Sequence, residues 1–122
     1  MSKKERDYTL FLEDIITAIE KIETYTKDLS LPDFRKNDMA VDAVIRNFEV
    51  IGEAAKSLPA KIKRKYPYVE WKEAMGFRDV LIHDYFGIDL EAVWDTVANN
   101  IPSFKENMLK VLESEQKVQK VK

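Results

Sequence analysis

The sequence predicts an all-α fold: a four- to five-helix up-and-down bundle in a single helical domain over residues 1–113. Three observations lead to this prediction. Apolar residues recur at three- and four-residue spacing along nearly the whole chain, as they do on one face of a helix. Three glycines and four prolines in 122 residues are too few for a β-sandwich or barrel with many tight turns. The length and a hydrophobic content of 45% suit one domain with its own core.

Two long helices and one short helix are expected in the first half of the chain. A first helix over residues 6–27 is indicated by an apolar stripe made of Tyr8, Phe11, Leu12, Ile15, Ile19, Ile22 and Tyr25. Pro32 ends this region, because proline disfavours helix at the residue before it. Asp38 is a suitable N-cap for a second helix, with Gly52 as a close packing contact on its apolar face. Pro59 then precedes a short helix over residues 60–65.

Two further helices are expected in the second half. Residues 70–85 are apolar over much of the helix circumference, which is typical of a central or interface helix. Asp89 is a suitable N-cap for the last helix. The apolar positions of that helix keep their phase through Pro102, so one long helix kinked near Pro102 is expected. Residues 114–122 form a polar tail that is expected to fray.

The composition excludes several kinds of site. The chain has no cysteine and one histidine, which rules out disulfides and thiolate metal sites and leaves no multi-histidine metal site in one chain. We therefore expect no metal and no cofactor. The first seven residues lack the apolar core of a signal peptide, and no apolar run is long enough to span a membrane. A soluble cytoplasmic protein without membrane association is expected.

A basic segment lies within this acidic chain. Residues 56–78 hold seven lysines and arginines against two glutamates, a net charge of +5, whereas the whole chain has a net charge of −2. Four of the basic residues cluster in the short helix and just after it: Lys61, Lys63, Arg64 and Lys65. They are candidates for contact with a polyanion. The alternative is a solvated connection between helices, which is the commoner role of a charge run.

Chemically capable side chains are concentrated between Arg78 and Tyr85. Arg78 lies in the middle of the apolar stripe of its helix, so it needs an acidic partner, a wet cleft or a subunit interface. His83, with an ordinary pKa of about 6.5, can exchange protons near neutral pH. Asp79, four residues before it, can orient the ring or raise its pKa. In a regular helix Arg78 and His83 point about 140° apart, so either the helix loosens or a second copy completes the site.

Each of these residues also has a purely structural interpretation. A lone histidine near a helix end is more often a capping residue than a catalyst. Arg78 can be half of an ion pair, with Glu49 or Glu53 as its mate, and Tyr85 can belong to the core or to an interface.

Taken together, the order Arg-x4-His-x-Tyr resembles the HEPN superfamily, and specifically the HepT-like toxins of the HepT–MntA toxin–antitoxin class. The resemblance covers residues 6–112 and includes four further strings: Ile51-Gly52-Glu53-Ala54, Phe77-Arg78, Tyr85-Phe86-Gly87-Ile88-Asp89 and Val93-Trp94. Because the set is ordered along the chain, it is more specific than an Arg–His pair alone.

The resemblance implies a HEPN-like bundle with a metal-independent endoribonuclease site at a homodimer cleft. Arg78 and His83 are then the catalytic residues, Asp79 supports them, and Tyr85 is adenylylated by an MntA-like nucleotidyltransferase antitoxin that silences the toxin. The substrate is RNA, with tRNA and mRNA both open, and the four basic residues from Lys61 to Lys65 are candidates for its backbone. Two alternatives remain: a non-catalytic helical dimer that binds nucleotide or the nucleotidyltransferase, and a purely structural module.

Overall fold

The computed structural model describes residues 7–82 and 89–121, with side chains described at residues 7–77 and 89–118. The described residues form helices and no strand, which confirms the all-α fold class. The helices are α1 (Tyr8–Thr26), α2 (Leu31–Lys36), α3 (Asp38–Ser57), α4 (Ala60–Lys65), α5 (Trp71–Ile82), α6 (Leu90–Asn99) and α7 (Ile101–Val121).

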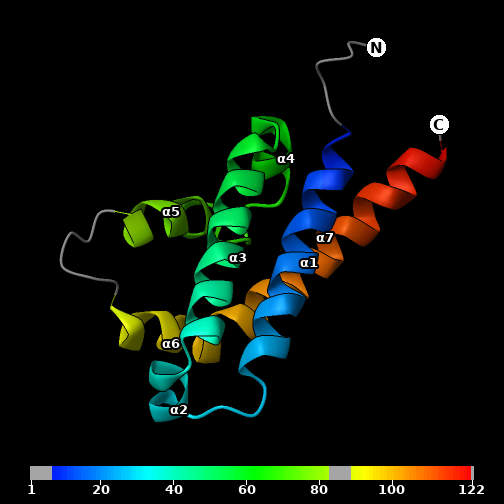
Figure 1. The fold of residues 1–122 in the computed structure, drawn as a ribbon. Helices are drawn as coiled ribbons and strands as arrows, with labels where there is room; N and C mark the ends of the chain where they lie inside the picture. Colours follow the sequence, from blue (N-terminus) through cyan, green and yellow to red (C-terminus); the bar gives the residue numbers. More distant parts are fainter. Residues whose placement is uncertain (1–6, 83–88, 122) are drawn as a thin grey trace.

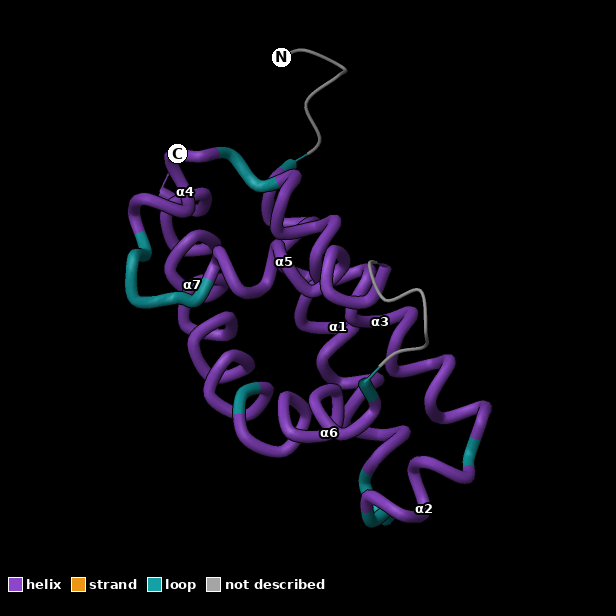
Figure 2. The backbone as a smooth tube through the Cα atoms, turned by 90° about the vertical axis from the view of Figure 1, so that its left-hand side faces the viewer, coloured by secondary structure: helices purple, strands orange, loops and turns teal. Residues whose placement is uncertain are grey.

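The long helices α1 and α3 run antiparallel through the centre of the molecule (Figure 1). Helix α7 packs on α1, and α5 packs on α3. Helix α4 lies near one end of this pair, whereas α2 and α6 lie at the other end (Figures 1 and 2). The core is built from fully buried aliphatic side chains of the central pair and α7, including Leu12, Ile15, Ile19, Val44, Ile51, Met108 and Val111. Each such side chain contributes roughly 1.5–3 kcal/mol on burial.

Helix α2 lies between the first helix and Asp38, where the sequence analysis placed no helix. Ser30 caps it through a capping box, in which the Ser30 side chain accepts from the Asp33 amide and the Asp33 carboxylate accepts from the Ser30 amide. Pro32 therefore ends one helical region and also stands in the first turn of the next, where its missing N–H costs nothing. Asn37, rather than Asp38, then caps α3 by accepting from the Ala40 amide at 3.0 Å.

The prediction of one long final helix kinked near Pro102 is wrong. The chain forms two helices instead: the Asn100 amide closes α6 on the Thr96 carbonyl at 2.9 Å, and the Asn100 carbonyl accepts the first bond of α7 from Phe104 at 3.1 Å. Pro102 cannot donate a backbone hydrogen bond, and it lies in the first turn of α7, where none is needed. This division and helix α2 together give two more helices among the described residues than the five expected.

The segment from Ser114 that is expected to fray is helical in the structure up to Val121. Within it, Glu115 is only 1% exposed. Glu115 lies four residues after the buried Val111, so it lies on the same side of α7. The buried stripe of α7 therefore continues past residue 113, where the domain is expected to end.

Candidate active site

Helix α5 carries Arg78, and its first turns are firmly packed. Trp71 and Ala74 are buried against the core, and the Trp71 indole N–H donates to the Tyr66 carbonyl at 2.9 Å. Phe77 meets the ring of Phe48 on α3 edge to face, with ring centroids 4.9 Å apart. The helix backbone is therefore anchored up to the residue before Arg78.

Helix α6 holds the chain on the other side of the candidate segment. The side chain of Asp89 caps α6 by accepting from the Ala92 amide at 3.1 Å, as expected from the sequence. Trp94 of α6 packs against Phe34 of α2 at 5.1 Å between ring centroids. The end of α5 and the start of α6 lie on the same edge of the molecule in Figure 1, and this edge faces the viewer in Figure 2. Residues on either side of the candidate segment are thus held by packed helices.

The catalytic candidates themselves fall mostly beyond what the structure describes. The backbones of Arg78 and Asp79 belong to α5, but their side chains are not among those described. His83 and Tyr85 lie outside the described residues. The roles predicted for these four residues, and the ion pair of Arg78 with Glu49 or Glu53, therefore stay predictions.

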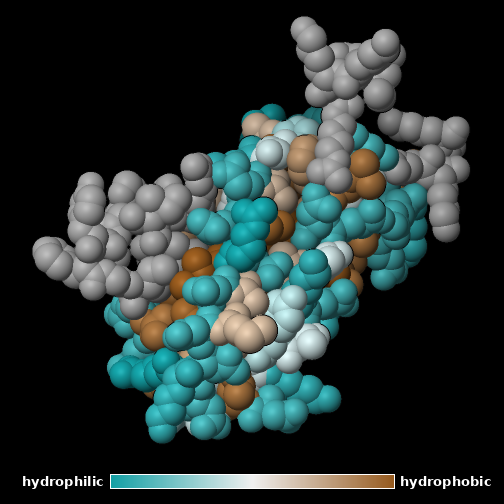
Figure 3. Space-filling view, viewed as in Figure 1, coloured by the Kyte–Doolittle hydropathy of each residue, from teal (hydrophilic) through white to brown (hydrophobic). Residues whose placement is uncertain are grey.

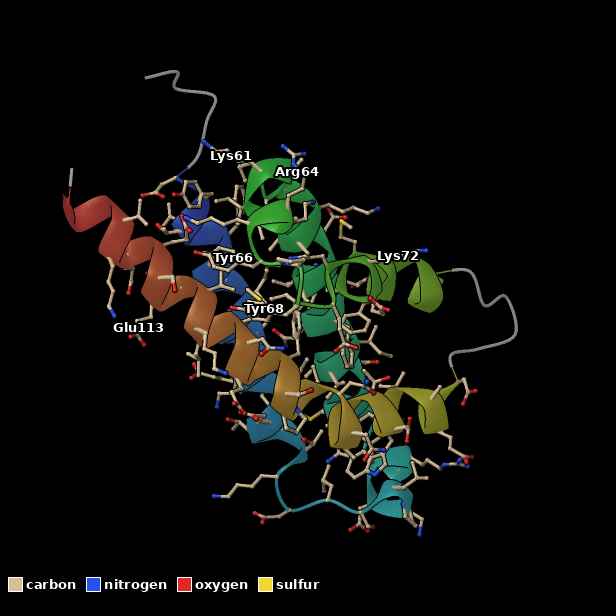
Figure 4. All side chains as sticks on the ribbon, turned by 180° about the vertical axis from the view of Figure 1, so that it is seen from behind. Lys61, Arg64, Tyr66, Tyr68, Lys72 and Glu113 are labelled. Carbon is tan, nitrogen blue, oxygen red and sulfur yellow. The ribbon has the colours of Figure 1, made fainter. Side chains whose placement is uncertain are left out.

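The basic cluster divides into two pairs. Lys63 turns inward, and its Nζ donates to the Ala55 carbonyl at 2.9 Å and lies 3.4 Å from Met75 Sδ. Burial lowers the pKa of Lys63. Lys65 pairs with Glu115 at 2.8 Å, and this hydrogen bond raises its pKa. Lys61 and Arg64 are exposed, and neither forms an ion pair with another described side chain. Lys65 is about half exposed but is held by Glu115, whereas Lys61 and Arg64, which Figure 4 labels on α4, extend into solvent.

A buried carboxylate that sequence reasoning missed joins three helices. Glu115 of α7 accepts from Tyr8 of α1 at 2.7 Å, from Lys65 of α4, and from the hydroxyl of Tyr66, which follows α4. Burial alone would raise the pKa of Glu115, but the hydrogen bonds from Lys65, Tyr66 and Tyr8 outweigh it and hold that pKa below the ordinary 4.5. The one sequence signal for this site was the position of Glu115 in the apolar phase of α7.

A hollow of about 160 Å³ opens between α5 and the junction of α6 with α7. Its lining includes two carboxylates, Glu70 and Glu73, and four apolar residues, Ala74, Phe77, Ile101 and Phe104. A phosphate would meet repulsion from both carboxylates, so this hollow does not suit a nucleic-acid backbone.

Two kinds of feature are missing from the described part of the chain. No group of three or more His, Asp or Glu side chains there is arranged to hold a metal ion. Among the same residues, none of the helices combines the length and apolar character needed to cross a membrane.

Comparison with known proteins agrees with the resemblance drawn from the sequence. A family model described as "Ribonuclease HepT-like" matches residues 15–111. A protein of Thermococcus cleftensis named "Probable ribonuclease HepT" is 45% identical over 105 residues, which are 86% of this chain and 93% of that protein. A Methanocaldococcus jannaschii protein named "Putative RNase" is 44% identical over 108 residues, 88% of this chain and 93% of its own length.

One similar protein is about twice as long. A second Methanocaldococcus jannaschii protein, named "Gamma-glutamylcyclotransferase and putative RNase", is 45% identical over 108 residues, and the match spans 88% of this chain but 49% of that protein. No solved structure gives a significant match to this chain. The resemblance to HepT-like proteins is thereby confirmed over most of the chain.

Proposed function

The chain belongs to the HepT-like ribonuclease family, and we propose that it is a toxin that cleaves RNA in the cytoplasm as a homodimer. The observation that carries the proposal is the family match over residues 15–111, which includes both anchored helices and the whole segment between them. The family match confirms the enzyme class, a ribonuclease. The toxin role, the mechanism and the partners described below are what we propose for this chain.

The proposed reaction uses the nucleophile that RNA already carries. His83 removes the proton from a ribose 2′-OH, and the 2′ oxygen attacks the adjacent phosphorus. The bond from phosphorus to the 5′ oxygen breaks, and that oxygen takes a proton from a second acid. The products are a 2′,3′-cyclic phosphate and a 5′-OH end. Arg78 holds the non-bridging oxygens in two parallel hydrogen bonds and stabilises the charge that develops on them. Asp79 supports His83, and the step requires no metal.

A homodimer supplies the second acid. One copy of the segment points Arg78 and His83 about 140° apart if its helix is regular, whereas two copies across a two-fold axis bring two Arg–His pairs to one cleft. Apolar side chains that remain partly exposed support such an interface: Val41 and Ile45 on α3, Phe77 on α5, and Leu90 on α6. Figure 3 shows hydrophobic side chains gathered between these helices on one face. A patch of this kind is typical of a contact between subunits.

The proposed regulator is an MntA-like nucleotidyltransferase encoded with the toxin. It would transfer AMP from ATP to the hydroxyl of Tyr85, with release of pyrophosphate. The adenylyl group adds bulk and negative charge two residues from His83, and a like charge there repels an incoming RNA phosphate. Intact-mass measurement after co-expression with the nucleotidyltransferase tests this step, because each modification adds one AMP to the mass and fragmentation assigns it to a residue.

The proposed cleavage is tested by single substitutions in the purified protein. Arg78→Ala and His83→Ala should each lower the rate of cleavage of total RNA by at least about 100-fold, the scale of lost acid–base or oxyanion stabilisation. Circular dichroism and size-exclusion chromatography establish that both variants still fold and associate. EDTA should leave wild-type cleavage unchanged. Cleavage at the wild-type rate by His83→Ala would refute the proposal.

A further inference from the structure

The turn between α4 and α5 displays one aromatic ring to solvent. Tyr66, Val69 and Trp71 around it are at most 8% exposed, whereas Tyr68 is 52% exposed. About half of Tyr68 therefore remains accessible to a ligand that stacks on its ring.

The turn holds that ring in a defined place. The Tyr66 carbonyl accepts from the Val69 amide at 3.1 Å and from the Trp71 indole at 2.9 Å, so the chain is tied on both sides of Tyr68. The ring of Tyr68 meets the ring of Tyr66 edge to face, with centroids 6.2 Å apart and planes at 88°. Tyr66 is itself hydrogen-bonded to Glu115. A ring fixed in this way loses little conformational entropy when a ligand stacks on it.

Exposed cations lie on both sides of the turn. Lys61 and Arg64 are three residues apart on α4, so they share one face of that helix. Lys72 is exposed on the first turn of α5, three residues before Met75 and on the same side of the helix. Lys63 of α4 reaches Met75 at 3.4 Å, so α4 lies toward the side of α5 that carries Lys72. Figure 4 shows Tyr68 on the turn, with Lys61 and Arg64 on one side and Lys72 on the other.

The carboxylates nearest to Lys72 in the sequence are Glu70, which precedes α5, and Glu73, which lies about 100° from Lys72 around the helix axis. Both line the hollow toward α6 and α7. Lys72 is therefore not neutralised by the carboxylate of Glu73 on its own helix.

We propose that Tyr68, Lys61, Arg64 and Lys72 form a binding surface for single-stranded RNA, in which a base stacks on Tyr68 and the phosphates contact the three cations. This inference rests on the proposed ribonuclease function and names where its substrate binds outside the cleavage site. An unpaired strand fits better than a duplex, because stacking on a side chain needs a base that is not already stacked and paired. Helix α5 leads from this surface toward Arg78, six residues and about 9 Å of helix rise beyond Lys72.

The experiment measures RNA binding separately from cleavage. The probe is a fluorescein-labelled single-stranded oligonucleotide with 2′-O-methyl ribose at every position, which has no 2′-OH to attack. Fluorescence anisotropy gives its Kd over a series of salt concentrations. Tyr68→Ala should weaken binding about 5- to 100-fold with an unchanged salt slope, and Tyr68→Phe should bind within about two-fold of wild type. Arg64→Ala and Lys72→Ala should each reduce the slope of log K against log salt by about 0.7.

Matched controls come from the opposite end of the molecule. Tyr25 is 40% exposed on α1, and Lys36 is exposed on α2, so Tyr25→Ala and Lys36→Ala remove the same side-chain types away from the surface. Both should bind the probe like the wild type. An equal loss of affinity in Tyr25→Ala and Tyr68→Ala, or no loss in Tyr68→Ala, would overturn the inference. Unchanged RNA binding together with lost binding of the nucleotidyltransferase would also overturn it, since the surface would then serve a protein.

Cleavage of unmodified RNA separates this inference from the proposed function. If the wild type binds the probe through Tyr68 but leaves RNA intact, the proposed function fails and the binding surface stands. If the wild type cleaves RNA in a manner that depends on His83 while Tyr68→Ala binds the probe normally, the surface fails and the proposed function stands. A wild-type protein that does not bind the probe overturns the surface directly.

Discussion

Replacing Glu115 by Gln tests whether one buried carboxylate holds α1, α4 and α7 together. The side chain is 1% exposed and accepts from Tyr8, Lys65 and Tyr66. Glutamine has almost the same shape, so the substitution leaves no cavity. It removes the negative charge and turns one of the two acceptor oxygens into a donor amide. The change therefore isolates the electrostatic part of the contact from its packing.

The expected loss follows from the number and type of hydrogen bonds. A hydrogen bond to a charged partner contributes about 1.5–3 kcal/mol, and a neutral one about 0.5–1.5 kcal/mol. Two tyrosine hydroxyls lose a charged acceptor, at roughly 1 kcal/mol each. The side chain of Lys65 is about half exposed, so solvent replaces much of what its ion pair contributes. We expect Glu115→Gln to lower the free energy of unfolding by about 2 kcal/mol and Tm by roughly 6–10 °C.

Urea unfolding followed by circular dichroism at pH 7 measures this difference. Glu113→Gln is the matched control, because Glu113 lies on the same helix with its side chain 70% exposed and pairs with Lys117 at 3.3 Å. An exposed pair four residues apart contributes about 0.3–0.5 kcal/mol, so the control should stay close to the wild type. Equal stability of the two variants, within about 0.5 kcal/mol, would refute the reasoning.

The difference in stability between the wild type and Glu115→Gln should depend on pH. The pKa of Glu115 is lowered in the folded protein from its ordinary 4.5, so the folded state favours the ionised form. The stability it contributes is complete above the unfolded pKa and is lost as the pH falls through the folded pKa. Protonated Glu115 resembles Gln, so the gap between wild type and Glu115→Gln should close over this acidic range. A gap that stays constant from pH 7 to pH 3 would contradict the assignment.

Three further substitutions test how α5 and α6 are held. Gly76→Ala should stabilise the protein by about 1 kcal/mol in urea unfolding, because a Cβ there meets no atom within 4 Å and alanine favours helix; destabilisation would mean that the space is occupied. Trp71→Phe should cost about 1–2 kcal/mol in the same assay, since it removes the indole bond to the Tyr66 carbonyl and some buried area. Asp89→Ala should lower the free energy of unfolding by about 1 kcal/mol, seen as a lower Tm. Asp89→Ser should restore most of this stability, because a serine side chain can also accept from the Ala92 amide.

Most helices could be predicted from local sequence because their signals are local. The spacing of apolar residues predicts α1, and Pro59 marks the start of the short helix α4 over residues 60–65. Capping chemistry identifies Asp89 as the residue before α6. The two errors in helix number both arose at prolines. At Pro32 and Pro102 the same ring that ends one helix is favourable in the first turn of the next. The spacing of apolar residues could not distinguish a kinked helix from two helices, because the apolar positions keep the same phase on both sides of Pro102.

The sequence shows the motif residues of the candidate site but does not show the buried contacts of Glu115. The order of Arg78, His83 and Tyr85 is visible in the sequence, and these residues lie within the range 15–111 that the family model matches. The Glu115 network was not predictable, because its partners Tyr8 and Tyr66 are 107 and 49 residues away along the chain. A glutamate in apolar phase at position 115 was a signal of burial, but the sequence offers no means of naming a donor until helices α1, α4 and α7 are packed.

The basic segment limits how strongly salt should affect RNA binding. The net charge of +5 over residues 56–78 counts every cation equally, yet Lys63 turns inward and Lys65 is paired with Glu115. Three exposed cations remain at the proposed surface. At about 0.7 per phosphate contact on a single strand, they predict a slope near −2 for log K against log salt, whereas five would predict about −3.5. If the slope contributed by this segment is near −3.5, Lys63 and Lys65 leave their internal partners when RNA binds, and the Glu115 network must open with them.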